Sequence, residues 1–480
     1  MDTYTLLRCC KGYFFMEKKR GRNEIMQQKT VLDVREVPKW NQWLILSLQH
    51  LFAMFGATVL VPFLTDMPPS VALITSGLGT LSYLLITRGK IPAYIGSSFA
   101  FIQPIVLASA VDGLAGAMVG AFLAGLVYGV VAILIAAVGV NWLFYILPPV
   151  VVGPVIMVIG LGLAPTAIDM AMFDDDGAYS LKYVSVAVVT LLITIIASVF
   201  FKGFWKVIPV LFGIVGGYIF ALFQGIVDTS GLSESWNRLA SSNSIGEFFA
   251  NLFSKPDFLI PFVHYSPFDV ISWSIVGIMV PVALVTITEH IGDQMVLSKI
   301  TGKNLIKEPG LNRSLFGDGV ATVIASVLGG PPNTTYGENI GVLAITRVFS
   351  VFVIGGAAVL AILFGFTDII SALINSIPTP VMGGVSILLF GIIASSGLRM
   401  LIDNNVDLGA NRNLIISSVI LVVGIGGALI KIELPNSDLE IAGMALAAII
   451  GVILNLVLPG KDLAKGNGNM FETSQEEEKV

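Results

Sequence analysis

Four carboxylic acids stand within long apolar stretches of this sequence: Glu289, Asp293, Asp318 and Glu338. Glu289 and Asp293 are four residues apart, so on a helix they share one face, with His290 on the adjoining flank. An ionised carboxylate at the centre of a bilayer costs about 2.5–3.5 kcal/mol, so acids in such a place usually serve binding or proton transfer. For each of them the alternative is a buried acid that a neighbour pairs for stability.

A carboxyl group in an apolar region can also couple a process to protons. Burial favours the protonated form, whereas a nearby cation or hydrogen-bond donor favours the charged form. A glutamate balanced between these effects binds and releases a proton near neutral pH, as coupling to a proton gradient requires. His50, in the first apolar stretch, either hydrogen-bonds to this site or ties two helices together.

The segment 331–347 is predicted to start a helix in the middle of an apolar region. Its two prolines break any preceding helix, and residues 333–335 are of the capping type. Glu338 then precedes an apolar run that ends at Arg347. In a bilayer, irregular backbone persists only where protein or a water-filled cavity surrounds it. The segment therefore predicts a buried binding site.

The start of this half-helix offers both kinds of hydrogen-bonding group. Unpaired main-chain N–H groups at Gly337 and Glu338 can donate, and the Glu338 carboxylate can accept. A small planar molecule with N–H donors and carbonyl acceptors would satisfy that mixture. Three aromatic residues nearby could stack on a flat ring or simply pack: Tyr94, Phe99 and Tyr336.

The composition indicates a membrane protein. Of 480 residues, 55% are hydrophobic and only 12% are charged, and the mean hydropathy is +0.86. Apolar runs of roughly 17–25 residues, the length that spans a bilayer, recur from Trp43 to Leu458. We count about fourteen: 43–64, 69–87, 91–109, 113–139, 146–166, 181–201, 204–226, 269–297, 311–329, 334–347, 349–367, 374–402, 413–431 and 440–458.

Lysine and arginine gather in alternate loops and in the two tails. These loops are 88–90, 202–206, 299–313 and 399–412. The opposite loops are acidic or neutral, among them 174–176 and a longer loop at 227–268. By the positive-inside rule the basic side is the cytoplasm. We therefore expect a plasma-membrane protein whose tails, 1–39 and 459–480, are both cytoplasmic.

The amino-terminal tail holds the only two cysteines, Cys9 and Cys10. They provide no disulfide framework and too few ligands for a metal, although lipidation there is conceivable. The first thirty residues lack a long apolar core followed by small residues, so a cleaved signal peptide is not expected. We expect neither a metal nor another cofactor.

The second half of the chain repeats the pattern of the first. Slid back by 240 residues, it places Glu289-His290 on Gln49-His50, Gly317-x-Gly319 on Gly77-x-Gly79 and Pro332 on Pro92. An offset of 231 places Pro380, Gly384 and Gly391 on Pro149, Gly153 and Gly160. Because seven spans per repeat is an odd number, the two copies must lie upside down relative to each other.

Inverted repeats with interrupted helices are typical of secondary transporters, whose substrate binds near the membrane midplane. The interrupted pair is predicted to be the third and tenth spans, where 91–99 matches 331–337. The predicted fold is therefore an all-α polytopic membrane protein of two seven-span inverted repeats. Short extended segments are expected in the two interrupted spans.

The run Glu338-Asn339-Ile340-Gly341-Val342-Leu343-Ala344-Ile345-Thr346-Arg347 resembles the signature of the nucleobase–ascorbate transporter family. That signature is an acidic or amide residue, Asn, any residue, Gly, four residues, Thr, and then a basic residue or Gly. Gln49-His50, Glu289-His290 and the runs 96–101 and 380–386 extend the resemblance over residues 40–458. The form of the motif is similar to that of bacterial uracil permeases, whereas purine and xanthine relatives more often have Gln at position 338.

The resemblance implies a uracil:proton symporter that works by alternating access and is not an enzyme. It implies that Glu289 and Glu338 hold the N–H groups of the ring, while the main chain at Phe99 and Gly337 contacts its carbonyl oxygens. We also expect Tyr336 at the substrate. Proton coupling is expected at Glu338, Asp293 and Glu289, and supporting roles at His50, His290 and Asn339.

The resemblance also implies two domains and a homodimer through one of them. The core domain comprises 40–139 and 269–367, and the gate domain comprises 140–226 and 368–458. A known uracil permease has a histidine where this chain has Asp293. Because a carboxylate can replace a neutral imidazole donor only when protonated, Asp293 either shares the coupling proton or changes the polarity of the site.

Two other classes of protein are less consistent with the sequence. An ion channel would use repeated rings of charges or carbonyls, and the unlike pairs Gln49/Glu289 and Ser97/Glu338 argue against one. An enzyme would need a nucleophile with a base, or metal ligands, which the predicted spans lack. The nearest alternative is a proton-coupled purine or xanthine permease. The expected partners are uracil, a proton and the lipid bilayer, and not nucleic acid.

Overall fold

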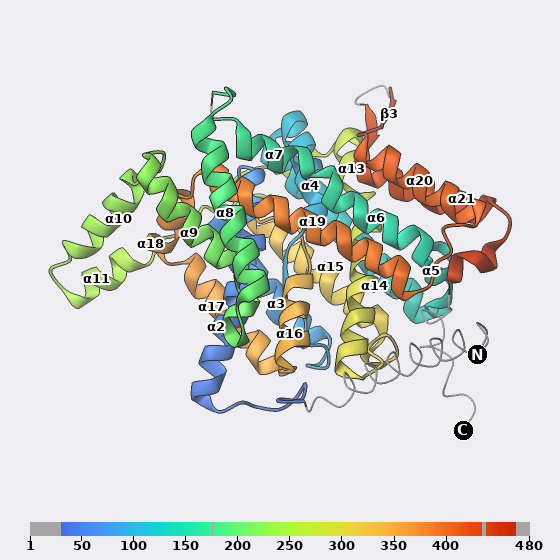
Figure 1. The fold of residues 1–480 in the computed structure, drawn as a ribbon, viewed down its shortest axis with the longest axis horizontal. Coiled ribbons are helices and arrows are strands. Elements are labelled where there is room, and N and C mark those ends of the chain that lie inside the picture. The colour runs from blue at the N-terminus through green and yellow to red at the C-terminus, as the bar shows by residue number, and fades with distance from the viewer. Residues whose placement is uncertain (1–29, 175, 434–437, 467–480) are drawn as a thin grey trace, which may run out of the picture.

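The computed structural model describes residues 30–174, 176–433 and 438–466, and it is mostly helical (Figure 1). Cys9 and Cys10 lie outside the described residues. The first half contains α2 (Trp40–Leu64), α3 (Pro69–Ile86), β1 (Ile95–Ser97), η1 (Phe99–Phe101), α4 (Ile102–Val138), α5 (Asn141–Ile146), α6 (Pro149–Gly162), α7 (Ala164–Met172), α8 (Leu181–Phe200), η2 (Gly203–Val207) and α9 (Pro209–Gln224).

The helices α10 (Ser230–Ala240) and α11 (Ile245–Leu252) connect the two halves. The second half contains α12 (Pro267–Val270), α13 (Trp273–Met279), α14 (Val282–Thr301), η3 (Ile306–Gly310), α15 (Leu311–Leu328), β2 (Asn333–Thr335), α16 (Gly337–Thr346), α17 (Val351–Gly365), α18 (Asp368–Asn375), α19 (Thr379–Asp403), α20 (Asn411–Ile425), β3 (Leu429–Ile432), β4 (Leu439–Ala442), α21 (Gly443–Val457) and η4 (Lys461–Lys465).

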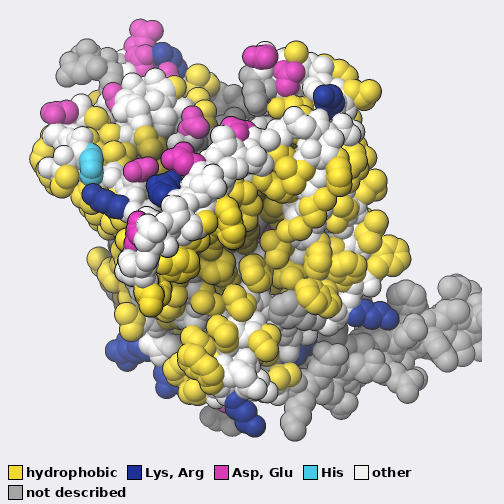
Figure 2. All heavy atoms as spheres, turned by 90° about the vertical axis from the view of Figure 1, so that its left-hand side faces the viewer, with side chains coloured by type: hydrophobic (Ala, Val, Ile, Leu, Met, Phe, Trp, Pro, Cys, Tyr) yellow, Lys and Arg dark blue, Asp and Glu magenta, His cyan; other side chains and the backbone are white. Residues whose placement is uncertain are grey.

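Several of these helices are suited to a bilayer. Within the described ranges, seven helical stretches are long and apolar enough to cross a membrane, and four further apolar helices have 10–17 residues. Figure 2 shows a broad band of hydrophobic side chains on one face. Acidic groups gather above this band, whereas the charged groups visible below it are almost all Lys and Arg. The count of about fourteen spans stays a prediction.

The two extended segments expected from the sequence are confirmed. β1 and β2 pair antiparallel, with Ile95 opposite Thr335 and Ser97 opposite Asn333. Each strand leads into a helix, β1 through η1 into α4 and β2 into α16. Prolines before each strand favour the extended backbone and prevent a helix from continuing through it. The starts of two half-helices therefore meet inside the molecule.

The helix packing follows a two-fold pattern around this strand crossing. In the group that contains the crossing, α4 packs on α15, and the equivalent pair, α17 and α3, packs in the same way. α3 also packs on α15. In the other group, α8 pairs with α9 as α20 pairs with α21, and α6 packs on α19. Exchanging the two halves of the chain reproduces these contacts, as an internal repeat predicts.

Two of the repeated glycines, Gly77 and Gly319, lie where helices approach each other closely. A Cβ atom added at Gly77 would lie 2.5 Å from the Ala358 carbonyl oxygen of α17. One added at Gly319 would lie 2.9 Å from the Gly125 carbonyl oxygen of α4. Glycine is thus required for the backbones of these helices to touch.

Several boundaries differ from the sequence prediction. The spans 91–109 and 113–139 share one helix, α4, which is kinked where Gly113 adopts a φ of +66°. The span 269–297 is divided before Pro281, because proline cannot donate a helical hydrogen bond. The helix predicted at 413–431 ends at Ile425, since Gly427 turns the chain with a φ of +66° into the hairpin β3–β4.

Candidate functional site

The acids of α14 lie beside the end of β2. Glu289 and Asp293 are partly exposed and share one face of the helix. The Thr335 hydroxyl, at the end of β2, donates a hydrogen bond of 2.6 Å to the Asp293 carboxylate. A Cβ atom added at Gly337 would lie 3.9 Å from the other Asp293 oxygen. The structure thus brings Asp293 and Gly337 together, as the prediction of one shared site requires.

The first turn of α16 is open. Gly337 is exposed and Glu338 is partly exposed, although both follow a fully buried strand. No side chain caps the helix, whose preceding residue is Tyr336. The first N–H groups of a helix have no partner within it. The start of α16 therefore presents main-chain donors next to the Glu338 carboxylate.

Glu289 carries an acceptor that lacks a partner. In the described part of the chain, its Oε2 is buried and makes no hydrogen bond. Buried polar atoms in folded proteins are nearly always paired, so an unpaired one needs an explanation. A bound molecule that donates an N–H group to Glu289 would supply the missing partner.

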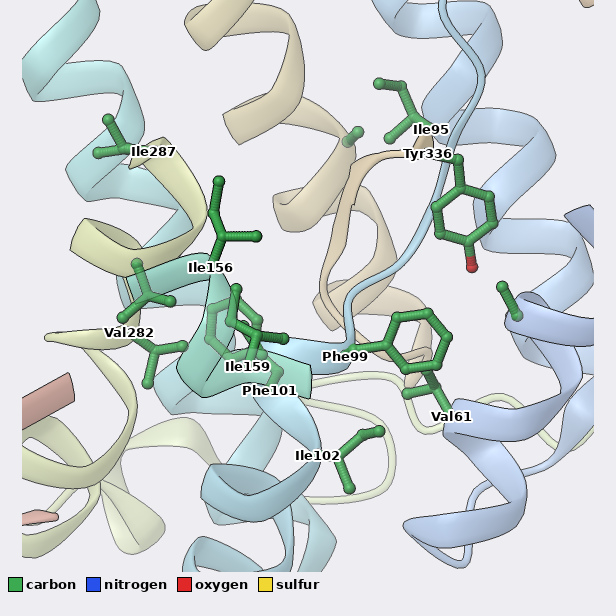
Figure 3. Close-up of a cluster of buried hydrophobic side chains, with 14 of the residues drawn as sticks. Val61, Ile95, Phe99, Phe101, Ile102, Ile156, Ile159, Val282, Ile287 and Tyr336 are labelled. Carbon is green, nitrogen blue, oxygen red and sulfur yellow. The ribbon is translucent and has the colours of Figure 1, made fainter. Parts of the chain in front are cut away.

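Phe99 links the two groups of helices. It follows β1, and its ring meets the ring of Phe390 on α19 edge to face, with centroids 5.8 Å apart. Figure 3 shows Phe99 and Phe101 in the buried cluster that also includes Ile156 and Val282. Sequence reasoning missed Phe390, because a phenylalanine within an apolar span carries no signal of its own.

Tyr336 and Tyr94 lie inside the strand crossing. The Tyr336 hydroxyl donates to the Ser97 carbonyl oxygen at 3.1 Å and accepts from Thr58 at 3.1 Å. Its ring lies over Gly96 and stacks on Tyr94, with centroids 6.2 Å apart. Tyr336 is 2% exposed and Tyr94 is 1% exposed, so both rings fix the two strands to each other.

The expected supporting residues form two buried contacts. The Asn339 amide lies 3.4 Å from His50 Nδ1 and 3.3 Å from the His50 carbonyl oxygen, so this pair ties α16 to α2.

His290 lies between Ser314, at 2.5 Å, and Asp318, at 3.1 Å, and all three side chains are fully buried. Asp318 also accepts a hydrogen bond of 3.4 Å from Thr334. Asp318 therefore also contacts β2, but it is fully buried, whereas Glu289 and Asp293 are partly exposed.

The chain is similar in sequence to known proteins of one family. The model of a family described as "Permease family" matches residues 41–432. A uracil permease of Bacillus subtilis (strain 168) is 62% identical over 437 residues, which is 90% of this chain and 96% of the relative. A uracil permease of Escherichia coli (strain K12) is 43% identical over 432 residues, which is 89% of this chain and 94% of the relative.

Solved transporters share the fold at low sequence identity. The transmembrane domain of a cyanobacterium bicarbonate transporter, BicA, matches with a TM-score of 0.55 and 12% identity, over 86% of this chain and 96% of that one. Murine SLC26A9, an anion transporter in the inward-facing state, matches with a TM-score of 0.60 and 11% identity, over 87% and 68%. These likenesses bear on the fold alone.

Proposed function

The chain belongs to this permease family, the nucleobase–ascorbate transporters, and we propose that it imports uracil together with a proton. It is a permease and a multi-pass membrane protein, not an enzyme. The names of its relatives support uracil, because they match over nine-tenths of the chain.

The unpaired Oε2 of Glu289 is the observation that best supports a nucleobase ligand. Uracil presents two N–H donors and two carbonyl acceptors around one flat ring. We propose that Glu289 and Glu338 accept the N–H groups, and that the main-chain N–H groups at Gly337 and Phe99 donate to the carbonyl oxygens. The open first turn of α16 and the partial exposure of Glu338 support this arrangement.

Proton coupling is proposed for Glu338, with Asp293 and Glu289 as further carriers. Three acids within one site repel each other when all are charged, and a bound proton relieves that repulsion. Uracil itself is neutral, so the proton, and not the substrate, would carry charge across the membrane.

We propose fourteen spans that move as two domains with the boundaries expected from the sequence. The strand crossing and its acids belong to the core domain, and Phe390 belongs to the gate domain. Alternating access would separate and rejoin contacts such as the one between Phe99 and Phe390. Both termini are proposed to be cytoplasmic. Two copies are proposed to form a homodimer through their gate domains.

Uptake of radiolabelled uracil into proteoliposomes tests this function. An inward proton gradient should stimulate uptake, and excess unlabelled uracil, but not xanthine or uric acid, should block it. Equal competition by xanthine would favour a purine or xanthine permease. A gradient without effect would contradict symport.

A further inference from the structure

The helices α10 and α11 form a hairpin whose apolar residues lie on one stripe of each helix. On α11 they are Ile245, Phe248, Phe249 and Leu252, at the spacing that places side chains on one face. On α10 they are Leu232, Trp236 and Leu239. Figure 1 shows the hairpin extending sideways, past α9, from the rest of the molecule.

The hairpin has a defined internal structure. Ser244 caps α11 by accepting a hydrogen bond of 3.1 Å from the Glu247 N–H, and Glu247 accepts one of 2.8 Å from the Asn243 N–H. The Asn251 amide donates to the Arg238 carbonyl oxygen at 3.0 Å, which joins α11 to α10. The relative orientation of the two stripes is therefore fixed.

The hairpin is also held against α18. Arg238 lies 3.5 Å from Asp368 at the start of α18. The Ser254 N–H, just after α11, donates to the Phe366 carbonyl oxygen at 2.9 Å. Because α18 connects α17 to α19, the hairpin is attached to the connection between the proposed core and gate domains.

The leucines of the stripe are half-buried, but its larger side chains are exposed. Ile245 is 80% exposed, Trp236 is 58% exposed and Phe249 is 53% exposed, and α11 has no buried residue. Soluble monomers rarely expose contiguous large apolar side chains, since each costs free energy in water. A fixed, exposed apolar stripe therefore needs an apolar environment.

The position of the hairpin identifies lipid as that environment. α9, which five residues separate from α10, exposes an apolar row of its own: Val215, Ile219 and Phe223. Figure 2 looks onto this side of the molecule and shows the hydrophobic band there. The stripe includes Trp236, and Trp side chains concentrate where acyl chains meet headgroups. The apolar surface of the hairpin thus continues the exposed apolar surface of α9, which is itself an apolar helix.

We propose that the α10–α11 hairpin lies in the membrane interface, with its apolar stripe among acyl chains and its polar side toward the headgroups. Amphipathic helices bind lipid surfaces in this way. The leaflet is the outer one if the proposed orientation is correct. Lipid would then hold the connection between the two domains at a fixed depth while the core domain moves.

Site-directed spin labelling tests this placement. The background is the full chain with Cys9→Ser and Cys10→Ser, which leaves no other cysteine. Labels are attached at Trp236→Cys and Phe249→Cys on the stripe. Leu192→Cys, on the exposed face of α8, is the lipid control, and Glu234→Cys, whose side chain is 77% exposed beside Arg238, is the water control.

Each variant is reconstituted in phosphatidylcholine and phosphatidylglycerol vesicles and probed with oxygen, which concentrates in lipid, and with a water-soluble nickel chelate. Labels on the stripe should collide preferentially with oxygen, as Leu192→Cys does. A preference for nickel equal to that of Glu234→Cys would overturn the proposal. Protection from both probes, with dipolar broadening between labels, would assign the stripe to a second copy instead. An unchanged unfolding temperature shows that a variant is folded, whether or not it transports uracil.

Discussion

Thr335 and Asp293 join β2 to α14 through a hydrogen bond of 2.6 Å. Thr335 is the last residue of the strand that leads to α16, and Asp293 lies one helical turn after Glu289. Any change in the charge of Asp293 therefore acts directly on the segment that positions Gly337 and Glu338. Protonation of Asp293 would therefore change the geometry of the proposed binding site.

Asp293→Asn should flatten the dependence of uracil uptake on pH. An amide oxygen can still accept the hydrogen bond of Thr335, but an amide does not titrate in this range. Initial uptake rates in proteoliposomes, measured between pH 5 and pH 8 in steps of about 0.5 pH unit, check this expectation. This range is the one in which a coupled group changes its charge.

Thr335→Val is the control for that variant. It removes the hydrogen bond but leaves the carboxylate free to titrate. A pH profile of Asp293→Asn that matches the unchanged protein would assign Asp293 a structural role only.

Glu338→Gln should abolish accumulation of uracil against its gradient. The amide cannot carry a proton, and it presents a donor where the ring N–H needs an acceptor. The loss of one such pairing costs roughly 1–3 kcal/mol, so binding should weaken by about 5-fold to 150-fold. Concentrative uptake and equilibrium binding are the two measurements.

Glu308→Gln is a matched control for Glu338→Gln. Glu308 is an exposed acid that pairs with Lys90 at the molecular surface. It should accumulate uracil normally. Uphill uptake by Glu338→Gln at the level of this control would refute the coupling role of Glu338.

The interrupted spans were predictable because local residues determine them. Prolines and small residues around 91–99 and 331–337 exclude a continuous helix whatever surrounds them. The side chain orientations within these segments were not predictable. The pairing of the two strands places the Tyr336 ring over Gly96, and register across a strand pair is a long-range property.

Two other features could not be predicted from the sequence: the contact of Phe99 with Phe390, and the α10–α11 hairpin. Phe390 is 291 positions from Phe99, so no local spacing relates them. The sequence predicts a loop for the segment that contains the hairpin, because the two helices are too short and too polar to resemble spans. The spans were counted by the length of each apolar run. This criterion identifies helices that cross the membrane, but it does not identify amphipathic helices that lie along the membrane surface.

Phe390→Ala should weaken uracil transport without preventing folding. An edge-to-face aromatic pair contributes about 0.5–1.5 kcal/mol beyond its buried area, so the KM for uracil should rise by roughly 2-fold to 10-fold. Val422→Ala, which truncates a 73% exposed side chain on α20, is the control. Equal KM values for the two variants would show that the contact between the two helix groups does not contribute to substrate binding.

Gly96→Ala should disrupt the strand crossing itself. A Cβ atom there would lie 2.6 Å from the Tyr336 ring, and hydrogen bonds to Thr58 and Ser97 prevent that ring from moving aside. Overpacking of this kind costs about 1–3 kcal/mol. The unfolding temperature should therefore fall, and uracil uptake should fall further, because the crossing positions both half-helices. Gly391→Ala is the matched control, since no atom lies within 4 Å of its added Cβ. If Gly96→Ala unfolds and transports like Gly391→Ala, the crossing tolerates displacement of Tyr336 and does not hold the site in place.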